Sequence, residues 1–284
     1  MKKIRIVADS TCDLSAEIIK RYDITIIPLC IVLDEKSYYD GSEITPEEIY
    51  AWSDEHKVTP KTAAISFDKT LDVLKPFMDA GDDIIFFGIS AQMSNTCNVA
   101  KLVGDGEGYE RLFVIDSKNL STGIGIQVIR ACELTASGKS AEEIVEEIEN
   151  ARDLVRASFV VDTLTFLARG GRCTAITALM ANTLKLHPQI LVKDGKMGVG
   201  KKFRGKTAVA IQAYVDDLMP ALQNADEKRV FITHSGCEAE IIDAVKAKIE
   251  AMGRFEEILI TQAGGVISSH CGPNTLGVLF YENA

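Results

Sequence analysis

The stretch that decides the fold is residues 82–100, which read DDIIFFGISAQMSNTCNVA. Its first half is an unbroken apolar run, too short for a typical helix and rich in β-branched and aromatic residues, as in a strand buried on both faces of a parallel sheet. Ser90, Ser94, Asn95 and Thr96 follow, and then a helical pattern resumes. This order places free N–H groups at the carboxyl edge of a sheet, where helix N-termini attract anions. Taken alone, the simpler interpretation is that Ser94 or Asn95 caps the helix.

The composition of the 284-residue chain narrows its functions. Hydrophobic residues make up 46% and charged residues 25%, as in a globular protein with a sizeable core. The net charge of −10 argues against nucleic-acid binding. The seven cysteines form no CxxC pair and no Cys/His cluster at zinc spacing, so we expect no disulfide framework and no metal. The sequence shows no signal-peptide or membrane-spanning run, and we expect a cytoplasmic protein.

Strand and helix patterns alternate up to residue 156 and predict an N-terminal α/β domain over residues 1–156. This alternation is typical of a Rossmann-like domain with a parallel sheet. Apolar runs at residues 4–8, 24–33, 84–87 and 112–115 are the predicted strands. We expect Pro28 to mark an edge or a bulge, residues 58–66 to form a loop, and residues 142–156 to form a helix.

The pattern changes after residue 156, and residues 157–284 are predicted to form a C-terminal α/β domain. A strand at residues 157–161 precedes a short helix that ends at Gly170-Gly171, and a further helix is predicted over residues 175–183. The Asp-Gly turn in residues 186–199 predicts a hairpin, so this second sheet is mixed. The last strand of the chain is expected in the second sheet or crossing between the two.

Four polar segments stand out as candidate ligand contacts. The first three adjoin elements of the first predicted sheet and can converge at its carboxyl edge. The segments are Asp9-Ser10-Thr11, Thr62 with Ser66, residues 90–96, and residues 269–273, which include His270. Each has a simpler interpretation as a turn or a cap, and Ser66 is expected to cap the helix that starts near Phe67.

No complete catalytic constellation is visible. Ser94 with His270 as its base would suit a serine hydrolase or acyltransferase, but no G-x-S-x-G elbow surrounds Ser94. The sequence has no GxxxxGK[ST] loop, no HExxH motif and no carboxylate cluster that suggests a catalytic metal. A phosphate-ligand binder is a further alternative, because arginines attract phosphate groups. The candidates are Arg172 and Arg204, which lies in the basic run KKFRGK. The sequence offers many groups that can donate hydrogen bonds to an anion but no complete catalytic set. This balance favours a binding protein over an enzyme.

Several short motifs, taken in their order along the chain, resemble the DegV family of bacterial fatty-acid-binding proteins. Each is weak alone, but together they cover nearly the whole sequence. They are DSTCDL (residues 9–14), YDG (39–41), PKT (60–62), ISAQMSNT (89–96), IDS (115–117), LTFLARGGR (164–172), PQILVKDG (188–195), RGK (204–206), HSG (234–236) and HCGP (270–273). The resemblance implies two α/β domains with a long-chain fatty acid buried between them and no other cofactor.

The resemblance also implies roles for particular residues. Thr62 and Ser94 match the family's Thr and Ser that hold the carboxylate, and His270 matches a histidine near the head group. Arg172 and Arg204 match arginines at the mouth of the site. The implied partner is a separate ATP-using fatty acid kinase, which phosphorylates the bound fatty acid for phospholipid synthesis, and transient contact with a membrane fits such a carrier.

Three positions beside the expected head group depart from the family's usual motifs. Ala63 stands in place of Ser, and Asn95 and Asn274 each stand in place of Gly. The carboxylate donors are retained, so fatty-acid binding remains the interpretation. The candidate ligand contacts are Thr62, Ser66, Ser94, Asn95, Arg172, Arg204 and His270.

Overall fold

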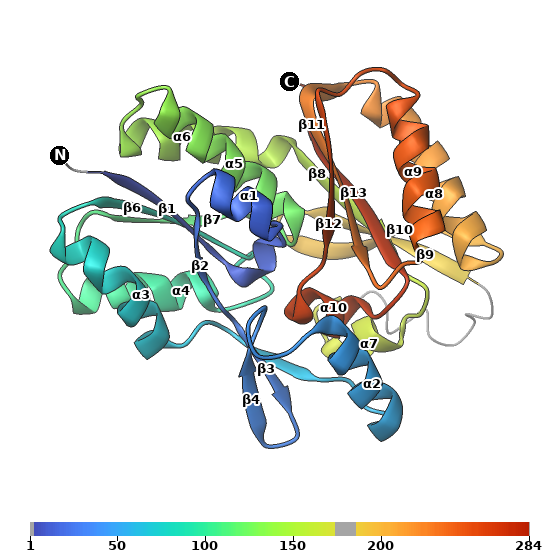
Figure 1. Cartoon of the computed structure of the whole chain (residues 1–284), viewed down its shortest axis with the longest axis horizontal. Helices are drawn as coiled ribbons and strands as arrows, with labels where there is room; N and C mark the ends of the chain where they lie inside the picture. The colour runs from blue at the N-terminus through green and yellow to red at the C-terminus, as the bar shows by residue number, and fades with distance from the viewer. Residues whose placement is uncertain (1–2, 174–185, 284) are drawn as a thin grey trace.

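The computed structural model describes residues 3–173 and 186–283. The helix predicted over residues 175–183 lies outside these residues. The described chain forms an α/β structure around a parallel four-stranded sheet, a mixed six-stranded sheet and a small antiparallel sheet (Figure 1). The two-domain α/β class that the sequence predicts is confirmed. The boundary predicted at residue 156 falls within a strand of the second sheet and stays a prediction.

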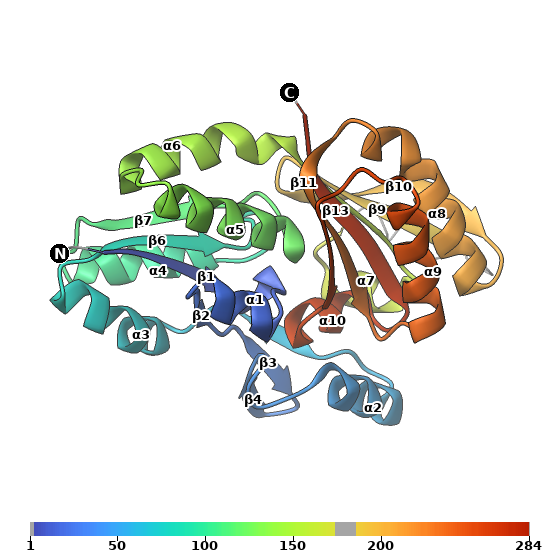
Figure 2. The same ribbon diagram turned by 45° about the horizontal axis from the view of Figure 1, so that its top comes forward.

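The first sheet has the strand order β2-β1-β6-β7, and all its strands are parallel. The strands are β1 (Ile4–Asp9), β2 (Thr25–Ile27), β6 (Asp83–Gly88) and β7 (Leu112–Asp116). Helices cover both faces, with α5 and α6 above the sheet and α3 and α4 below it (Figure 2). The helices of this part are α1 (Ala16–Arg21), α3 (Phe67–Asp79), α4 (Thr96–Gly106), α5 (Thr122–Ala136) and α6 (Ala141–Ala151).

Strand β6 is buried on both faces, as its sequence predicts. Ile85 and Phe87 pack into the core on the α5 and α6 side, whereas Ile84 and Phe86 pack into the core on the α3 and α4 side. All four side chains are fully buried. Successive side chains of a strand point to opposite faces, so an unbroken apolar run is what a strand between two helical layers requires.

The apolar run at residues 24–33 is two strands rather than one. Residues 25–27 pair with β1 as strand β2, and this pairing ends before Pro28. The run continues after Pro28 as β3 (Cys30–Leu33), which belongs to the small sheet. Proline has no N–H for a ladder hydrogen bond, which favours a break there. The small sheet has the order β4-β3-β5, with β4 (Lys36–Tyr39) and β5 (Lys61–Ala63). The prediction of a loop throughout residues 58–66 is therefore wrong, and α2 (Pro46–His56) connects β4 to β5.

The second sheet is mixed and has the order β10-β9-β8-β13-β11-β12. Its strands are β8 (Val155–Val160), β9 (Leu186–Lys193), β10 (Lys196–Arg204), β11 (Ala225–Ser235), β12 (Glu257–Gln262) and β13 (Thr275–Glu282). The predicted hairpin is confirmed as β9 and β10, and the last strand lies inside this sheet. The predicted helix over residues 142–156 is too long, because α6 ends at Ala151 and β8 begins at Val155.

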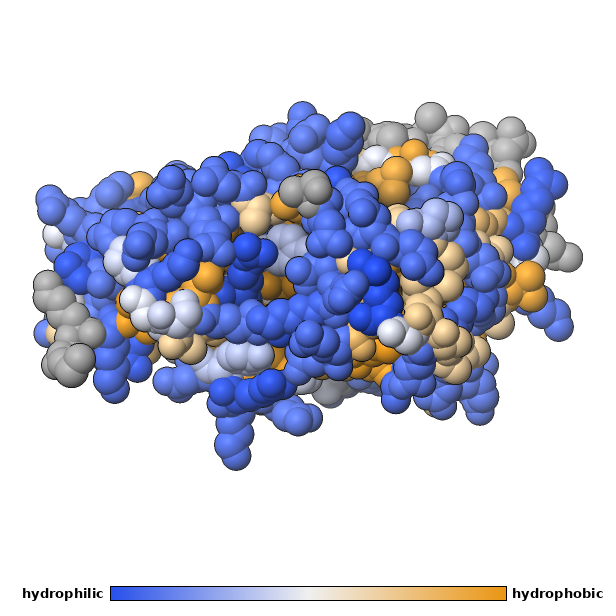
Figure 3. Space-filling view, turned by 90° about the horizontal axis from the view of Figure 1, so that it is seen from above, coloured by the Kyte–Doolittle hydropathy of each residue, from blue (hydrophilic) through white to orange (hydrophobic). Residues whose placement is uncertain are grey.

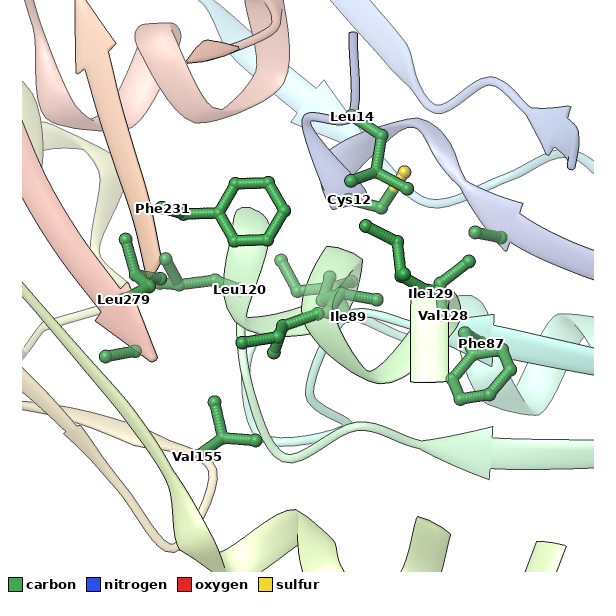
Figure 4. Close-up of a cluster of buried hydrophobic side chains, with 14 of the residues drawn as sticks. Cys12, Leu14, Phe87, Ile89, Leu120, Val128, Ile129, Val155, Phe231 and Leu279 are labelled. Atoms are coloured by element: carbon green, nitrogen blue, oxygen red, sulfur yellow. The ribbon is translucent and has the colours of Figure 1, made fainter. Parts of the chain in front are cut away.

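Helices α8 (Thr207–Leu222) and α9 (Ala239–Glu250) cover the outer face of the second sheet, and its inner face meets the first domain (Figure 1). One apolar core continues across this junction. Figure 4 shows Phe231 and Leu279 of the second sheet on one side and Val128 and Ile129 of α5 on the other, with Ile89 between. The two domains therefore share buried apolar surface, which stabilises their arrangement.

Hydrophilic residues dominate the face seen from above, where apolar residues are scattered (Figure 3). Within the described ranges, no helix combines the length and the apolar character needed to cross a membrane. Two short helices lie at the lower end of the second sheet, beside the small sheet. These are α7 (Thr165–Gly170) and α10 (Gly265–Cys271). Their position brings the C-terminal domain to the edge where the first sheet's polar loops emerge.

Candidate functional site

A cavity lies where the first sheet, the small sheet and α10 meet. The space between its walls amounts to about 510 Å³, including solvent at its open mouth. Both domains supply its walls, and most of its lining is apolar. The lining residues are Leu29, Thr62, Ala63, Ala64, Ile89, Met93, Ser94, Leu120, Arg172, Met197, Val266, Ile267, His270 and Cys271.

A second apolar space adjoins the first deeper between the domains. It encloses about 340 Å³ and shares Leu120, Ile267 and Cys271 with the first cavity. Phe159 and Leu279 of the second sheet form part of its wall. The apolar lining therefore continues from the first cavity toward the second sheet.

The polar side chains gather at one end of this space. Thr62 lies on β5, where it is half-buried between the more exposed Lys61 and Ala63. Its Oγ1 is 2.9 Å from Nε2 of His270, which lies in the last turn of α10. This hydrogen bond joins the N-terminal domain to the C-terminal domain across the cavity. The pairing of β5 with β3 sets the position of Thr62, so the small sheet is the element that carries this donor.

His270 is held neutral at ordinary pH. Burial and, to a smaller extent, the charge of Arg172 lower the pKa of its imidazole from 6.5 to about 4. Its Nδ1 has no hydrogen-bond partner among the described residues. A Cβ on Gly170 would lie 2.2 Å from that nitrogen, so glycine is required there. The Gly-Gly pair thus makes room for the histidine at Gly170 and turns the chain at Gly171, which has φ of +69°.

Ser94 belongs to the loop between β6 and α4. Its Oγ is 2.9 Å from Oγ1 of Thr96, and its N–H donates to the carbonyl of Ser90 at 3.1 Å. Asn95 is the N-cap residue of α4, but its side chain makes no capping hydrogen bond and is exposed. The simpler interpretation, in which one of these side chains only caps the helix, is therefore wrong. The Ser94 hydroxyl remains available at the cavity wall.

The predicted site residues divide into two groups. Thr62, Ser94, Arg172 and His270 line the same cavity. Ser66 caps α3 instead, since its Oγ accepts the N–H of Lys69 at 3.2 Å. Arg204 is exposed at the end of β10 and is outside the lining, as are Ser66 and Asn95.

Two of the departures from the family's motifs have a clear structural setting. Ala63 lies in the cavity wall, where a serine would add one more hydroxyl. Asn274 has φ of +58°, a left-handed conformation that glycine adopts most easily and asparagine next. Asparagine therefore serves the turn after α10 that a glycine would otherwise form.

Sequence reasoning missed the helix α10. Residues 269–273 were expected as a polar loop, but residues 265–271 are helical and present Val266 and Ile267 to the cavity together with His270. The spacing of these three residues, three and four positions apart, is a helical pattern and is the signal that could have revealed the helix. The surrounding glycines and serines, which are weak helix formers, obscured it.

The hydrogen bonds at the polar end do not form the serine–histidine pair that a hydrolase needs. A hydrolase needs the serine hydroxyl against the histidine, but Ser94 pairs with Thr96 and His270 pairs with Thr62. Among the described residues, no hydrogen bond joins Ser94 to His270, and no group of His, Cys, Asp and Glu is arranged to hold a metal ion. Hydroxyls, a neutral imidazole and the guanidinium of Arg172 at one end of an apolar cavity suit an amphipathic ligand with an acidic head.

The fold and the site define a two-domain α/β protein with an apolar interdomain cavity that is polar at one end. A family model described as "Uncharacterised protein, DegV family" matches residues 3–283, and this chain belongs to the DegV family. The resemblance carried by the sequence motifs is thereby confirmed.

The chain is similar over nearly its whole length to other DegV proteins and to solved structures of this fold. A DegV domain-containing protein of Clostridium acetobutylicum is 32% identical over 283 residues, which is 99% of each chain. A DegV family protein of Thermus thermophilus, described as binding fatty acid, is 31% identical with a TM-score of 0.90, and the match covers 99% of this chain and 100% of that one. A stearic acid-binding protein of Eubacterium ventriosum is 28% identical with a TM-score of 0.85, over 99% of this chain and 98% of that one.

Proposed function

We propose that this protein binds a long-chain fatty acid between its two domains. The carboxylate would accept hydrogen bonds from Thr62 and Ser94, near His270 and Arg172, and the alkyl chain would follow the apolar lining inward. The observation that carries the proposal is the gathering of these four side chains at one end of an otherwise apolar cavity. The fatty-acid binding described for the Thermus thermophilus and Eubacterium ventriosum proteins supports it.

The two ends of the ligand contribute differently. Burying a methylene stabilises a complex by ~0.8 kcal/mol, so a long alkyl chain accounts for most of the affinity. A hydrogen bond to a charged group contributes about 1.5–3 kcal/mol, so Thr62 and Ser94 mainly set the orientation. The carboxylate then lies at the mouth, where a second protein can reach it.

We also propose that the protein is a carrier in the cytoplasm rather than an enzyme, and that it presents the carboxylate to a separate ATP-using fatty acid kinase. Acyl phosphate formation would take place on the partner. Arg172 at the cavity and Arg204, exposed at the end of β10, are candidate contacts for the acyl phosphate or the kinase. Transient contact with a membrane would supply the fatty acid and receive the product.

Mass spectrometry of the denatured purified protein tests the central proposal. We expect a co-purified long-chain fatty acid, and thermal stabilisation when fatty acids are added to the delipidated protein. Ser94→Ala should weaken binding by roughly tenfold to a hundredfold. Ser66→Ala also removes one hydroxyl, but from outside the cavity, and should leave binding unchanged. The absence of any co-purified lipid, together with no thermal shift across several chain lengths, would contradict the proposal.

A further inference from the structure

Three carboxylates lie buried at the junction of the two domains and take no part in the cavity lining. Asp9, Asp13 and Asp40 are 0%, 5% and 4% exposed. They belong to the DSTCDL and YDG motifs, which the proposed binding site leaves without a role. Burial raises the pKa of each carboxyl group. Buried acids are costly, so their partners indicate what they do.

Two of these carboxylates hold the start of α10. Oδ1 of Asp13 accepts the N–H of Gly264 at 2.8 Å, and Oδ1 of Asp40 accepts the N–H of Gly265 at 2.7 Å. The first N–H groups of a helix have no partner within the helix, so a carboxylate there satisfies them and complements the helix dipole. Both acids come from the N-terminal domain, whereas α10 belongs to the C-terminal part of the chain.

The second oxygen of each acid is fixed as well. Ser121 Oγ donates to Asp13 Oδ2 at 2.5 Å, and Ser10 Oγ donates to Asp40 Oδ2 at 2.8 Å. These carboxylates therefore have little freedom to rotate away from α10. Their second partners, Ser10 and Ser121, also belong to the N-terminal domain. The N-terminal domain therefore positions the acceptors for α10 by itself.

The third carboxylate holds the loop that leads to Ser94. Oδ2 of Asp9 accepts the N–H of Ile89 at 2.7 Å, and Oδ1 accepts the N–H of Thr11 at 2.9 Å. Ile89 lines the cavity and lies five residues before Ser94. The same cluster of acids thus fixes both polar walls of the cavity, one through the loop after β6 and one through α10.

The start of α10 is packed too closely for small shifts. A Cβ on Gly265 would lie 2.5 Å from Cδ1 of Ile31 and 2.8 Å from Cδ1 of Ile49. At 1.5 Å per residue a seven-residue helix is about 10 Å long, so the acids at its start lie one short rigid element away from His270 at its end. Displacing the start moves His270 relative to Thr62.

We propose that Asp9, Asp13 and Asp40 are positioning residues for the polar end of the cavity: Asp13 and Asp40 set the helix that carries His270, and Asp9 sets the loop that carries Ser94. The effect on ligand affinity rests on the proposed fatty-acid binding, whereas the effect on His270 does not. The N–H of Gly265 needs an oxygen acceptor at position 40 and not a charge. An asparagine at this position keeps the acceptor, whereas an alanine removes it.

The test compares Asp40→Ala with Asp40→Asn in the full chain labelled with ¹⁵N-histidine and freed of lipid. The chain has four histidines, so the imidazole signals are few. We expect Asp40→Ala to shift the His270 signals and to weaken fatty-acid binding by roughly tenfold to a hundredfold, the effect of losing a hydrogen bond to a charged group. Asp40→Asn keeps an oxygen for Gly265, and its NH2 group can donate to the Ser10 hydroxyl in place of accepting from it, so it should stay near wild type in both measurements.

Asp82→Ala is the matched control, because Asp82 is also a buried acid of this domain but bonds to Lys3 and Arg5, away from the cavity. It should lower stability and leave the His270 signals and the fatty-acid affinity unchanged.

If Asp40→Ala does not fold, Ser121→Ala, which removes the donor to Asp13 Oδ2, should still shift the His270 signals. Unchanged His270 signals in the folded variants, or equal losses in Asp40→Ala and Asp40→Asn, would overturn the inference. A failure of wild type to bind any fatty acid would overturn the proposed function alone.

Discussion

Replacing His270 with glutamine should remove a loss of stability that the protein suffers in mild acid. Burial and the nearby Arg172 lower the pKa of His270 from 6.5 to about 4 in the folded protein. As the pH falls below 6.5, the unfolded chain takes up a proton at this residue and the folded protein does not. Proton uptake then favours unfolding, so stability falls as the pH falls from 6.5 to about 4 and stops changing below that.

The size of the effect follows from the two pKa values. At ~1.4 kcal/mol per pH unit, the interval between 6.5 and about 4 corresponds to about 3 kcal/mol of unfolding free energy. This is a large share of the 5–15 kcal/mol typical of a domain. Asp9, whose pKa burial raises to about 6, titrates in the same interval with the opposite sign, so the wild-type curve alone does not isolate the histidine.

The measurement is therefore a difference between two proteins. Urea unfolding of delipidated wild type and His270→Gln at several pH values between 7.5 and 4 gives two stability curves. We expect the variant to gain about 3 kcal/mol relative to wild type across this range, whatever the substitution costs at neutral pH. His56→Gln, which removes an exposed imidazole from α2, is the control and should not reproduce this change. A constant difference between wild type and His270→Gln would refute the reasoning.

Three further substitutions test other parts of the structure. Burial raises the pKa of Asp9 from 3.8 to about 6, so wild type should lose stability relative to Asp9→Asn as the pH rises from about 4 to 6, and urea unfolding of both proteins checks this sign. Gly265→Ala forces a methyl group against Ile31 and should cost about 1–3 kcal/mol, seen as a lower urea midpoint. Thr62→Val keeps the volume but loses the hydroxyl; displacement of a fluorescent fatty acid should show roughly tenfold or greater loss of affinity, and an unchanged affinity would remove Thr62 from the site.

The sequence predicted those features that local patterns determine. The apolar run of β6 predicted a strand between two helical layers, because each of its side chains needs an apolar neighbour. The Asp194-Gly195 pair predicted the β9 and β10 hairpin, and both residues have the positive φ that such a turn requires. These features were predictable since each depends on residues close together in the chain.

The small sheet and α10 were not predictable in the same way. Strand β5 has only three residues and forms only because β3 pairs with it, so Thr62 was found as a polar loop residue and not as part of a sheet. Helix α10 is short and rich in glycine and serine, and its stability comes from packing and from acceptors supplied by the N-terminal domain. Tertiary contacts override local preference in both cases.

The polar segments Asp9-Ser10-Thr11 and residues 90–96 show why a site cannot be read from loop composition alone. Both follow parallel strands at the same sheet edge, and both offer groups that satisfy backbone N–H groups or bind an anion. In the structure, Asp9 accepts protein amides, whereas Ser94 faces the cavity. The N–H of Gly264 that Asp13 accepts is 251 residues away, so no local pattern could reveal that this acid serves α10. Buried carboxylates near a candidate site are therefore better assigned by the donors they hold than by the ligands they resemble.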